Sequence, residues 1–329
     1  MTVTLAADGI AIAEPGAEAG EVWSYRAVSL RDDELREGPV RIAHGDARLT
    51  VEDPAFAAAL MTAAPRLRRA ARLILVCGTA ATILLLAGAG GLWWWMPRIA
   101  ARIAEHVPPA WEEKLAEQVE TQPWWGPRCT GSAGQAALDA LTRRLTEGVD
   151  IPYPLVVSVR DDRMVNAFAL PGGHIVLLRG LLNEAQSPDE VAGVLGHELT
   201  HTLKRHPTRA LIANSGLSLL FELTVGNGTG ASLGLLLTTL SYTRTMEAEA
   251  DDGAVALLER AGIGTEGFAA FFDRMAKHGH GPKLPYFNSH PPDEERLAAV
   301  RAHAVKGGRP AISETEWYAL KAICDIKSQ

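Results

Sequence analysis

Two histidines and a glutamate near the middle of the chain have a spacing that favours metal-dependent hydrolysis. His197 and His201 are four residues apart, so on an α-helix their side chains project from nearly the same face, one turn apart. Two imidazole nitrogens in this arrangement can bind one metal ion. Glu198 is adjacent to the first histidine, so its carboxylate can approach a water beside the metal and act as a general base. The alternative is a histidine pair with purely structural partners.

A third ligand for the same ion is expected from the acidic helical segment 246–252, because a catalytic zinc site has three protein ligands and one open position. Glu247 and Asp251 are four residues apart and share a helix face. Glu247 is the candidate ligand, and Asp251 is the candidate acceptor for the free ring nitrogen of a ligand histidine. Glu249 points away from that face and is expected to be solvated. Without the upstream histidines, the segment would be predicted to be an ordinary charged helix face.

The sequence before the two histidines contains strong signals for the start of a helix. Ser187 suits the N-cap, Pro188 suits the first helical position and Glu190 completes a capping box. Pro207 ends the helix. Since His206 lies nine residues after the first histidine, it falls on the opposite helix face and is not expected to be a ligand.

Four motifs, in this order along the chain, resemble those of the gluzincin zinc metallopeptidases, the family that includes HtpX, the CAAX prenyl endopeptidases and the Oma-type proteases. They are Asn166 to Gly173, His197 to His201, Glu247 with Ala250 and Asp251, and Ser289-His290-Pro291 followed by Arg296. The resemblance covers residues from about 130 to 305. It implies that one Zn²⁺ per chain is bound by His197, His201 and Glu247, with Glu198 as the general base.

The hydrophobic pattern around these motifs predicts an α+β domain that is mostly helical. A helix is expected from about Ser132 to Thr146, and strands are expected at 155–159, 164–169 and 175–178. The resemblance implies a zincin-type metallopeptidase domain in which helices surround a small sheet. Strand 175–178 is a candidate for pairing with an extended substrate, and an ordinary position in the sheet core is the alternative.

Three further parts are predicted ahead of the metallopeptidase domain, which takes residues 131–329. Residues 1–70 are expected to form a small cytoplasmic domain that contains a β-hairpin with its turn at His44-Gly45-Asp46. Residues 73–96 are expected to be a transmembrane helix, and residues 97–130 a connector. The expected architecture is therefore one membrane helix between a small β-containing domain and the peptidase domain.

The membrane helix is predicted because residues 73–96 contain no charged side chain and are long enough to cross the hydrocarbon layer. The tryptophans from Trp93 to Trp95 are typical of a membrane interface. Arginines before the segment outnumber those after it, so the positive-inside rule places the peptidase domain on the periplasmic side. We therefore predict a single-pass protein of the bacterial inner membrane that contacts the lipid bilayer. A buried core helix or an uncleaved signal is the alternative. The single anchor favours the Oma-type branch of the resemblance.

Two of the three cysteines follow the predicted membrane helix and so fall on its outer side, where disulfides persist. We predict that Cys129 and Cys324 pair, tying the start of the peptidase domain to its end. Two unpaired buried thiols are the alternative. The third cysteine, Cys77, lies within the predicted span.

The composition is that of a folded, mildly acidic protein, with 47% hydrophobic residues and a net charge of −7. The abundance of alanine, glycine and arginine is typical of a GC-rich bacterial genome. The sequence has no basic patch with interleaved aromatic residues, so nucleic acid is not an expected partner.

These features together predict a membrane-anchored zinc endopeptidase that cleaves unfolded or damaged envelope and membrane proteins. In this mechanism Glu198 takes a proton from water and passes it to the leaving amine. His290 has three possible roles: a donor to the transition-state oxyanion, an occupant of the open position on zinc, or a residue that orders the following proline turn. The alternative function is a membrane-tethered, chaperone-like binding module with a structural zinc. Glu198 argues against it, since a structural zinc needs no base.

Overall fold

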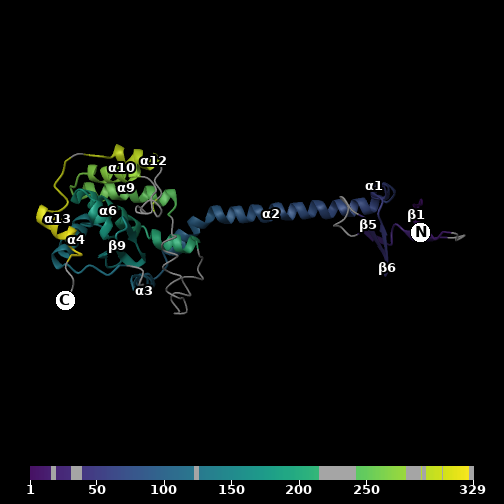
Figure 1. The fold of residues 1–329 in the computed structure, drawn as a ribbon, viewed down its shortest axis with the longest axis horizontal. Helices are drawn as coiled ribbons and strands as arrows, with labels where there is room; N and C mark the ends of the chain where they lie inside the picture. The colour runs from purple at the N-terminus through teal and green to yellow at the C-terminus, as the bar shows by residue number, and fades with distance from the viewer. Residues whose placement is uncertain are drawn as a thin grey trace. The chain divides into compact units, whose positions relative to one another are not determined.

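The computed structural model describes two compact units, Met1–Trp94 and Trp95–Gln329, which are treated separately below (Figure 1). The described residues are 1–15, 20–30, 39–121, 126–214, 242–278, 290, 294–305 and 307–325. The chain is mostly helical and carries small sheets, in agreement with the coarse fold class predicted from the sequence. Residues 215–241, which separate the histidine pair from Glu247, lie outside the described residues.

The first unit contains two antiparallel sheets of three strands and a short helix. The strands are β1 (Thr2–Leu5), β2 (Gly9–Ala13), β3 (Glu21–Ser24), β4 (Val28–Leu30), β5 (Val40–His44) and β6 (Ala47–Val51), and the helix is α1 (Pro54–Ala63). Strands β5 and β6 form the predicted hairpin, and Gly45 takes the positive φ of 55° that its turn requires. Ile10, Ile42 and Leu60 are fully buried in the core of this unit.

The long helix α2 (Pro65–Ala104) contains the segment for which a membrane span is predicted. Among the described residues, no single helix is long and apolar enough to cross a bilayer. A pair of helical segments, 76–91 and 94–104, passes the same test together with a bend of 41° between them. Pro97 lies inside the second segment, where its ring is incompatible with a regular helix. Apolar side chains such as Leu84 and Leu85 are exposed along this helix.

A sheet of three strands forms the centre of the second unit. The strands β7 (Val156–Arg160), β8 (Ala167–Ala169) and β9 (His174–Leu178) are arranged in the order β7-β9-β8. Strand β9 pairs in parallel with β7 and antiparallel with β8, and all its residues are buried. The hypothesis that strand 175–178 pairs with substrate is therefore wrong, because both of its edges are already hydrogen-bonded. Among the described strands, β8 lies at an edge of this sheet instead.

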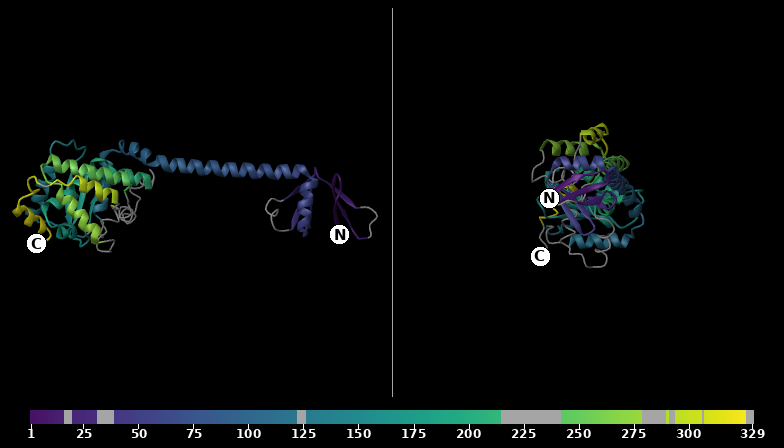
Figure 2. Two further views of the ribbon diagram at one scale, coloured as in Figure 1. Left: turned by 90° about the horizontal axis from the view of Figure 1, so that it is seen from above. Right: turned by 90° about the vertical axis from the view of Figure 1, so that its right-hand side faces the viewer.

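Two helices far apart in the sequence pack together beside this sheet (Figures 1 and 2). They are α6 (Pro188–Leu203), which also contacts β8 and β9, and α9 (Arg244–Arg260). Their close approach requires Gly253, since a Cβ at this position would lie 2.3 Å from the Thr200 side chain. Helix α10 (Glu266–His278) packs on α6 and helix α12 (Glu294–Ala302) packs on α9. This arrangement fixes the two helices that carry the candidate ligands.

The start and the end of the predicted peptidase domain, residues 131–329, meet through helices α4 (Ser132–Leu145) and α13 (Glu314–Lys321). The structure contains a disulfide between Cys129 and Cys324, the pair for which the sequence predicts one. The backbone N–H of Gly131 donates to the carbonyl of Ile323 beside it, at 3.0 Å. Cys77 is exposed and unpaired by disulfide.

We expect replacement of Cys129 by serine to lower the free energy of unfolding by about 2–5 kcal/mol, because the disulfide closes a very long loop of the unfolded chain. Denaturant unfolding of the full chain under non-reducing conditions measures this loss. Cys77→Ser is the matched control and should leave the stability unchanged. A non-reducing mass map with both Cys129 and Cys324 as free thiols would contradict the prediction.

Candidate metal centre

The helix that presents the two histidines has the N-cap and the first-turn proline that its sequence predicts, but not the predicted capping box. Ser187 is the N-cap and its hydroxyl accepts from the N–H of Glu190, while Pro188 takes the first turn. The Glu190 carboxylate accepts from the N–H of Gln186 at 2.8 Å, one residue before the position expected for a capping box. It also forms an ion pair with Arg274 of α10. The start of α6 is thereby fixed to a neighbouring helix.

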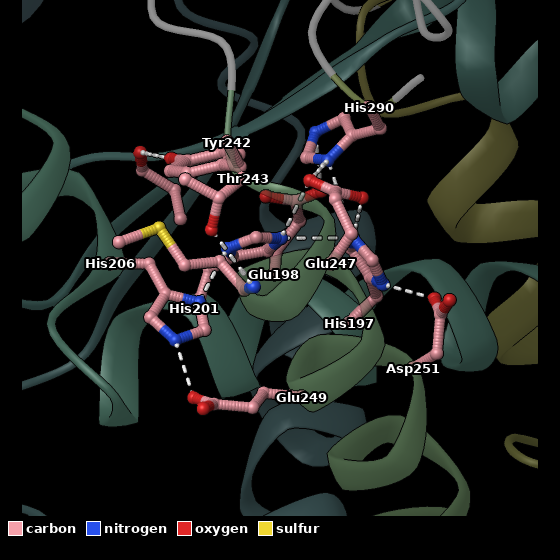
Figure 3. Close-up of polar contacts among 12 residues, drawn as sticks. His197, Glu198, His201, His206, Tyr242, Thr243, Glu247, Glu249, Asp251 and His290 are labelled. Atoms are coloured by element: carbon pink, nitrogen blue, oxygen red, sulfur yellow. Dashed lines mark hydrogen bonds and ion pairs between the residues drawn. The ribbon is translucent and has the colours of Figure 1, made fainter. Parts of the chain in front are cut away.

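Four ligand atoms from three parts of the chain meet in a buried cluster (Figure 3). Helix α6 supplies His197 and His201, whose Nε2 atoms lie 3.0 Å apart. Glu247, in the first turn of α9, places one carboxylate oxygen 3.6 Å from His197 Nε2 and the other 3.5 Å from His201 Nε2. His290 places its Nδ1 3.3 Å from His197 Nε2 and 3.0 Å from a Glu247 oxygen. All four side chains are buried.

The spacing of these atoms fits one tetrahedral metal ion. Zinc binds imidazole nitrogen at about 2.0–2.1 Å, so two ligand atoms on a tetrahedral ion lie about 3.3 Å apart. Five of the separations between these groups run from 3.0 to 3.6 Å, and all four ligand atoms lie within 4.8 Å of one another. Nitrogen and carboxylate oxygen are donor types that zinc accepts. The residues present therefore fit one Zn²⁺.

The outer nitrogen of the first histidine has an acidic partner, as the sequence predicts. His197 Nδ1 lies 2.9 Å from a carboxylate oxygen of Asp251, one turn after Glu247 on α9. Arg296 of α12 forms an ion pair with Asp251 at 2.7 Å and another with Glu247 at 2.8 Å. Burial raises the pKa of the Asp251 carboxyl, but the bonds from His197 and Arg296 more than offset this and hold the pKa below its usual range. A carboxylate in this position favours the proton on Nδ1 and leaves Nε2 free to bind a metal.

The outer nitrogen of the second histidine has a partner that the sequence pattern did not reveal. His206 is buried, and its Nδ1 lies 2.9 Å from His201 Nδ1. Its Nε2 lies 3.1 Å from a carboxylate oxygen of Glu249 (Figure 3). The expectation that Glu249 is merely solvated is therefore wrong. Helical phase failed for His206 because α6 ends at Leu203, before the helical repeat reaches that residue.

The predicted general base lies directly beside the cluster. Glu198 is buried, and one of its oxygens lies 3.4 Å from His290 Nε2. Burial raises the pKa of the Glu198 carboxyl, although the nearby His290 and His197 oppose the rise. Burial, followed by the neighbouring His197, lowers the pKa of His201 well below its usual value. The low-dielectric surroundings thus favour a neutral His201, which is the form that binds metal.

One aromatic residue of the site also lay outside the sequence predictions. The ring of Tyr242 stacks on the ring of His201, with centroids 4.1 Å apart, and its hydroxyl donates to the carbonyl of Ala169 at 3.4 Å. Tyr242 belongs to no recognisable motif, so no pattern of residue spacing could have predicted its contact with His201. In contrast, His174 lies apart from the cluster, and its Nδ1 lies 2.6 Å from a carboxylate oxygen of Glu120.

The geometry defines a metallopeptidase-like centre, and comparison with known proteins gives its family. Residues 132–304 match peptidase family M48. A putative beta-barrel assembly-enhancing protease of Vibrio cholerae is 32% identical over 51% of this chain and 38% of its own length. The mitochondrial metalloendopeptidase OMA1 of Arabidopsis thaliana is 34% identical over 43% of this chain and 30% of its own length. The metalloprotease YcaL of Escherichia coli is 31% identical over 44% of this chain and 59% of its own length.

The chain belongs to peptidase family M48, a family of zinc metallopeptidases. This confirms the resemblance that the sequence motifs indicate, and with it the class of enzyme and the zinc cofactor. The matched part covers less than two thirds of each of these relatives. The roles of the individual site residues in this chain are proposals.

Proposed function

We propose that this protein is a membrane-anchored zinc endopeptidase that cleaves unfolded or damaged proteins of the bacterial envelope. The observation that carries the proposal is the buried cluster of His197, His201 and Glu247, with Glu198 adjoining it. Relatives with assembly-enhancing and metalloendopeptidase names support the assignment of an envelope or membrane-protein substrate.

In the proposed mechanism the ion is held by His197, His201 and Glu247. Bound zinc supplies a Lewis acid that polarises the scissile carbonyl and acidifies water. Glu198 takes the proton of the attacking water and delivers it to the leaving amine. Its buried position and raised pKa suit both steps, because a base with a pKa closer to neutrality can also return the proton.

The edge strand β8 is the proposed binding place for the substrate backbone. Among the strands that the structure describes, only β9 pairs with β8, and the opposite edge of β8 is the proposed place for pairing with an extended chain. The backbone of Ala169 on β8 also interacts with Glu198, which places the edge strand next to the proposed base. A substrate paired there would have its peptide bonds near the ion. Strand pairing requires extended backbone, which favours unfolded segments over folded ones.

We expect Glu198→Gln to keep its zinc and to lose proteolytic activity by about 10²–10⁴-fold, because glutamine cannot accept the water's proton. Cleavage of casein by the detergent-solubilised full chain, with zinc quantified in the same preparations, measures both quantities. Glu247→Gln is the contrasting control and should lose zinc as well as activity. Full activity in a zinc-loaded Glu198→Gln protein would show that the mechanism is wrong. A zinc-loaded wild type that cleaves no unfolded protein would favour the chaperone-like alternative.

His290 is proposed to restrain this activity in the conformation described. Its Nδ1 completes the cluster at 3.3 Å from His197 Nε2, in the position where a catalytic zinc site keeps its opening. The other nitrogen, Nε2, lies 3.4 Å from Glu198. Histidine in this place occupies the space that the attacking water needs. Among the roles considered for His290, the geometry favours the occupant of the open position.

We expect His290→Ala to retain zinc and to cleave casein faster than the wild type, because the fourth position then becomes available to water. Initial cleavage rates at equal zinc occupancy measure the effect. A slower reaction in a zinc-loaded His290→Ala protein would instead assign His290 to stabilisation of the transition-state oxyanion.

Residues 73–96 are proposed to anchor the protein in the inner membrane, with the peptidase domain in the periplasm. The uncharged sequence and the exposed apolar side chains of Leu84 and Leu85 on α2 support this proposal.

Protease added to intact spheroplasts is expected to digest the second unit and spare residues 1–70. Protection of both units would overturn the proposed orientation, and release by alkaline carbonate would overturn the anchor.

A further inference from the structure

The two candidate histidine ligands differ in the partner of Nδ1, the ring nitrogen that faces away from the metal cluster. His197 has the carboxylate of Asp251 at its outer nitrogen, at 2.9 Å. His201 has a second imidazole there, since His206 Nδ1 lies 2.9 Å from His201 Nδ1. The Nδ1 atoms of both ligand histidines are buried. In each contact, one proton between the two atoms is enough to form a hydrogen bond. The proposed metal function assigns no role to His206 or to the carboxylate behind it.

Hydrogen-bonding rules determine the positions of the protons in the contacts from His201 through His206 to Glu249. A neutral histidine has one donor and one acceptor nitrogen, so a contact between two Nδ1 atoms needs a proton on one of them only. Glu249 is an acceptor at 3.1 Å from His206 Nε2, which places the proton of His206 on Nε2. His206 Nδ1 is then an acceptor, and His201 must donate to it from Nδ1. The Nε2 lone pair of His201 therefore faces the metal cluster.

A strained backbone brings His206 to this position. Arg205 has a φ of 53°, and it is the one residue other than glycine with a positive φ in the described part of the chain. This left-handed conformation is unfavourable for an L-residue. Contacts of the Arg205 side chain stabilise it: the guanidinium donates to the carbonyl oxygens of Ala104 and Val107 and lies 3.5 Å from the buried Glu112. The turn redirects the chain, so that His206 returns to the side of His201.

The carboxylate at the end of the chain of contacts is itself positioned. Glu249 lies on α9 two residues after Glu247, and Arg209 approaches its carboxylate to 3.7 Å. Helix α9 therefore supports both histidines of α6, through Asp251 for His197 and through Glu249 for His201. Each ligand histidine is therefore backed by a carboxylate of α9 that in turn contacts an arginine. In the case of His201, the imidazole of His206 lies between the ligand and the carboxylate.

We propose that His206 and Glu249 form a positioning relay that holds His201 in the tautomer and ring orientation needed to bind zinc. This inference rests on the zinc site proposed above. The two residues act through His201 and touch neither the ion nor the substrate. Partners of this kind behind a ligand histidine typically change metal affinity by 10- to 100-fold when removed.

The test measures zinc affinity of the full chain in detergent by competition with a chromophoric chelator. We expect His206→Ala to raise the dissociation constant for zinc by about 10–100-fold. His206→Asn should recover part of this loss, because the side-chain oxygen of asparagine can accept near the position of Nδ1. Glu249→Gln should also weaken binding, since the neutral amide no longer polarises His206. Asp252→Asn is the matched control: it removes one negative charge from the exposed face of the same helix.

Two further readouts separate a positioning role from a structural one. The visible spectrum of the Co²⁺-substituted protein should change in His206→Ala and be closer to wild type in His206→Asn. Thermal unfolding of the metal-free variants reports any loss of packing alone. The relay is overturned if His206→Ala and Glu249→Gln bind zinc as tightly as Asp252→Asn, whatever their thermal stability. If His206→Ala does not fold, the half-exposed Glu249→Gln decides by the same comparison. A wild type that binds no zinc would instead overturn the proposed zinc site itself.

Discussion

The burial of several ionisable side chains between α6 and α9 is the constraint on which the rest of the structure depends. His197, His201, Glu198, Glu247 and His290 are almost inaccessible to water. Buried polar and charged groups are costly unless they are paired or bind a metal. The structure meets this cost with one cluster whose atoms are spaced for a metal ion and with partners behind the ligands. The positively charged Arg296 balances part of the acidic charge from the side of α12.

A few close contacts between helices, in addition to the sheet, hold the ligand residues and their partners together. Gly253 allows α9 to approach Thr200 on α6, and the ion pair between Glu190 and Arg274 fixes the start of α6 to α10. The strained turn at Arg205 depends on carbonyl groups near the end of α2. The last residue of α2, Ala104, therefore contacts the turn that follows α6. Metal ligands need this kind of rigid presentation, because small displacements weaken both binding and catalysis.

The family match and the site coincide, whereas the remainder of the chain lies outside the match. Residues 132–304 contain every proposed ligand, the proposed base and the relay of His206 and Glu249. Residues 1–131, including both sheets of the first unit and helix α2, have no counterpart in that match. The proposed chemistry and the proposed membrane anchor therefore fall in different parts of the chain. The M48 domain gives the reaction class, and residues 1–70 have no assigned role.

The sequence by itself determined the features that depend on local periodicity and local chemistry. Helical spacing placed His197 with His201 and Glu247 with Asp251, and turn chemistry gave the hairpin at Gly45. Only the tertiary structure decided the rest. Periodicity put His206 on the wrong face because the helix ends before it, and Glu249 was judged solvated because its partner comes from another helix. The central position of β9 depends on strand order, and the place of His290 depends on a long-range path. Apart from the contact between His206 and His201, these are contacts between distant segments, which local pattern does not encode.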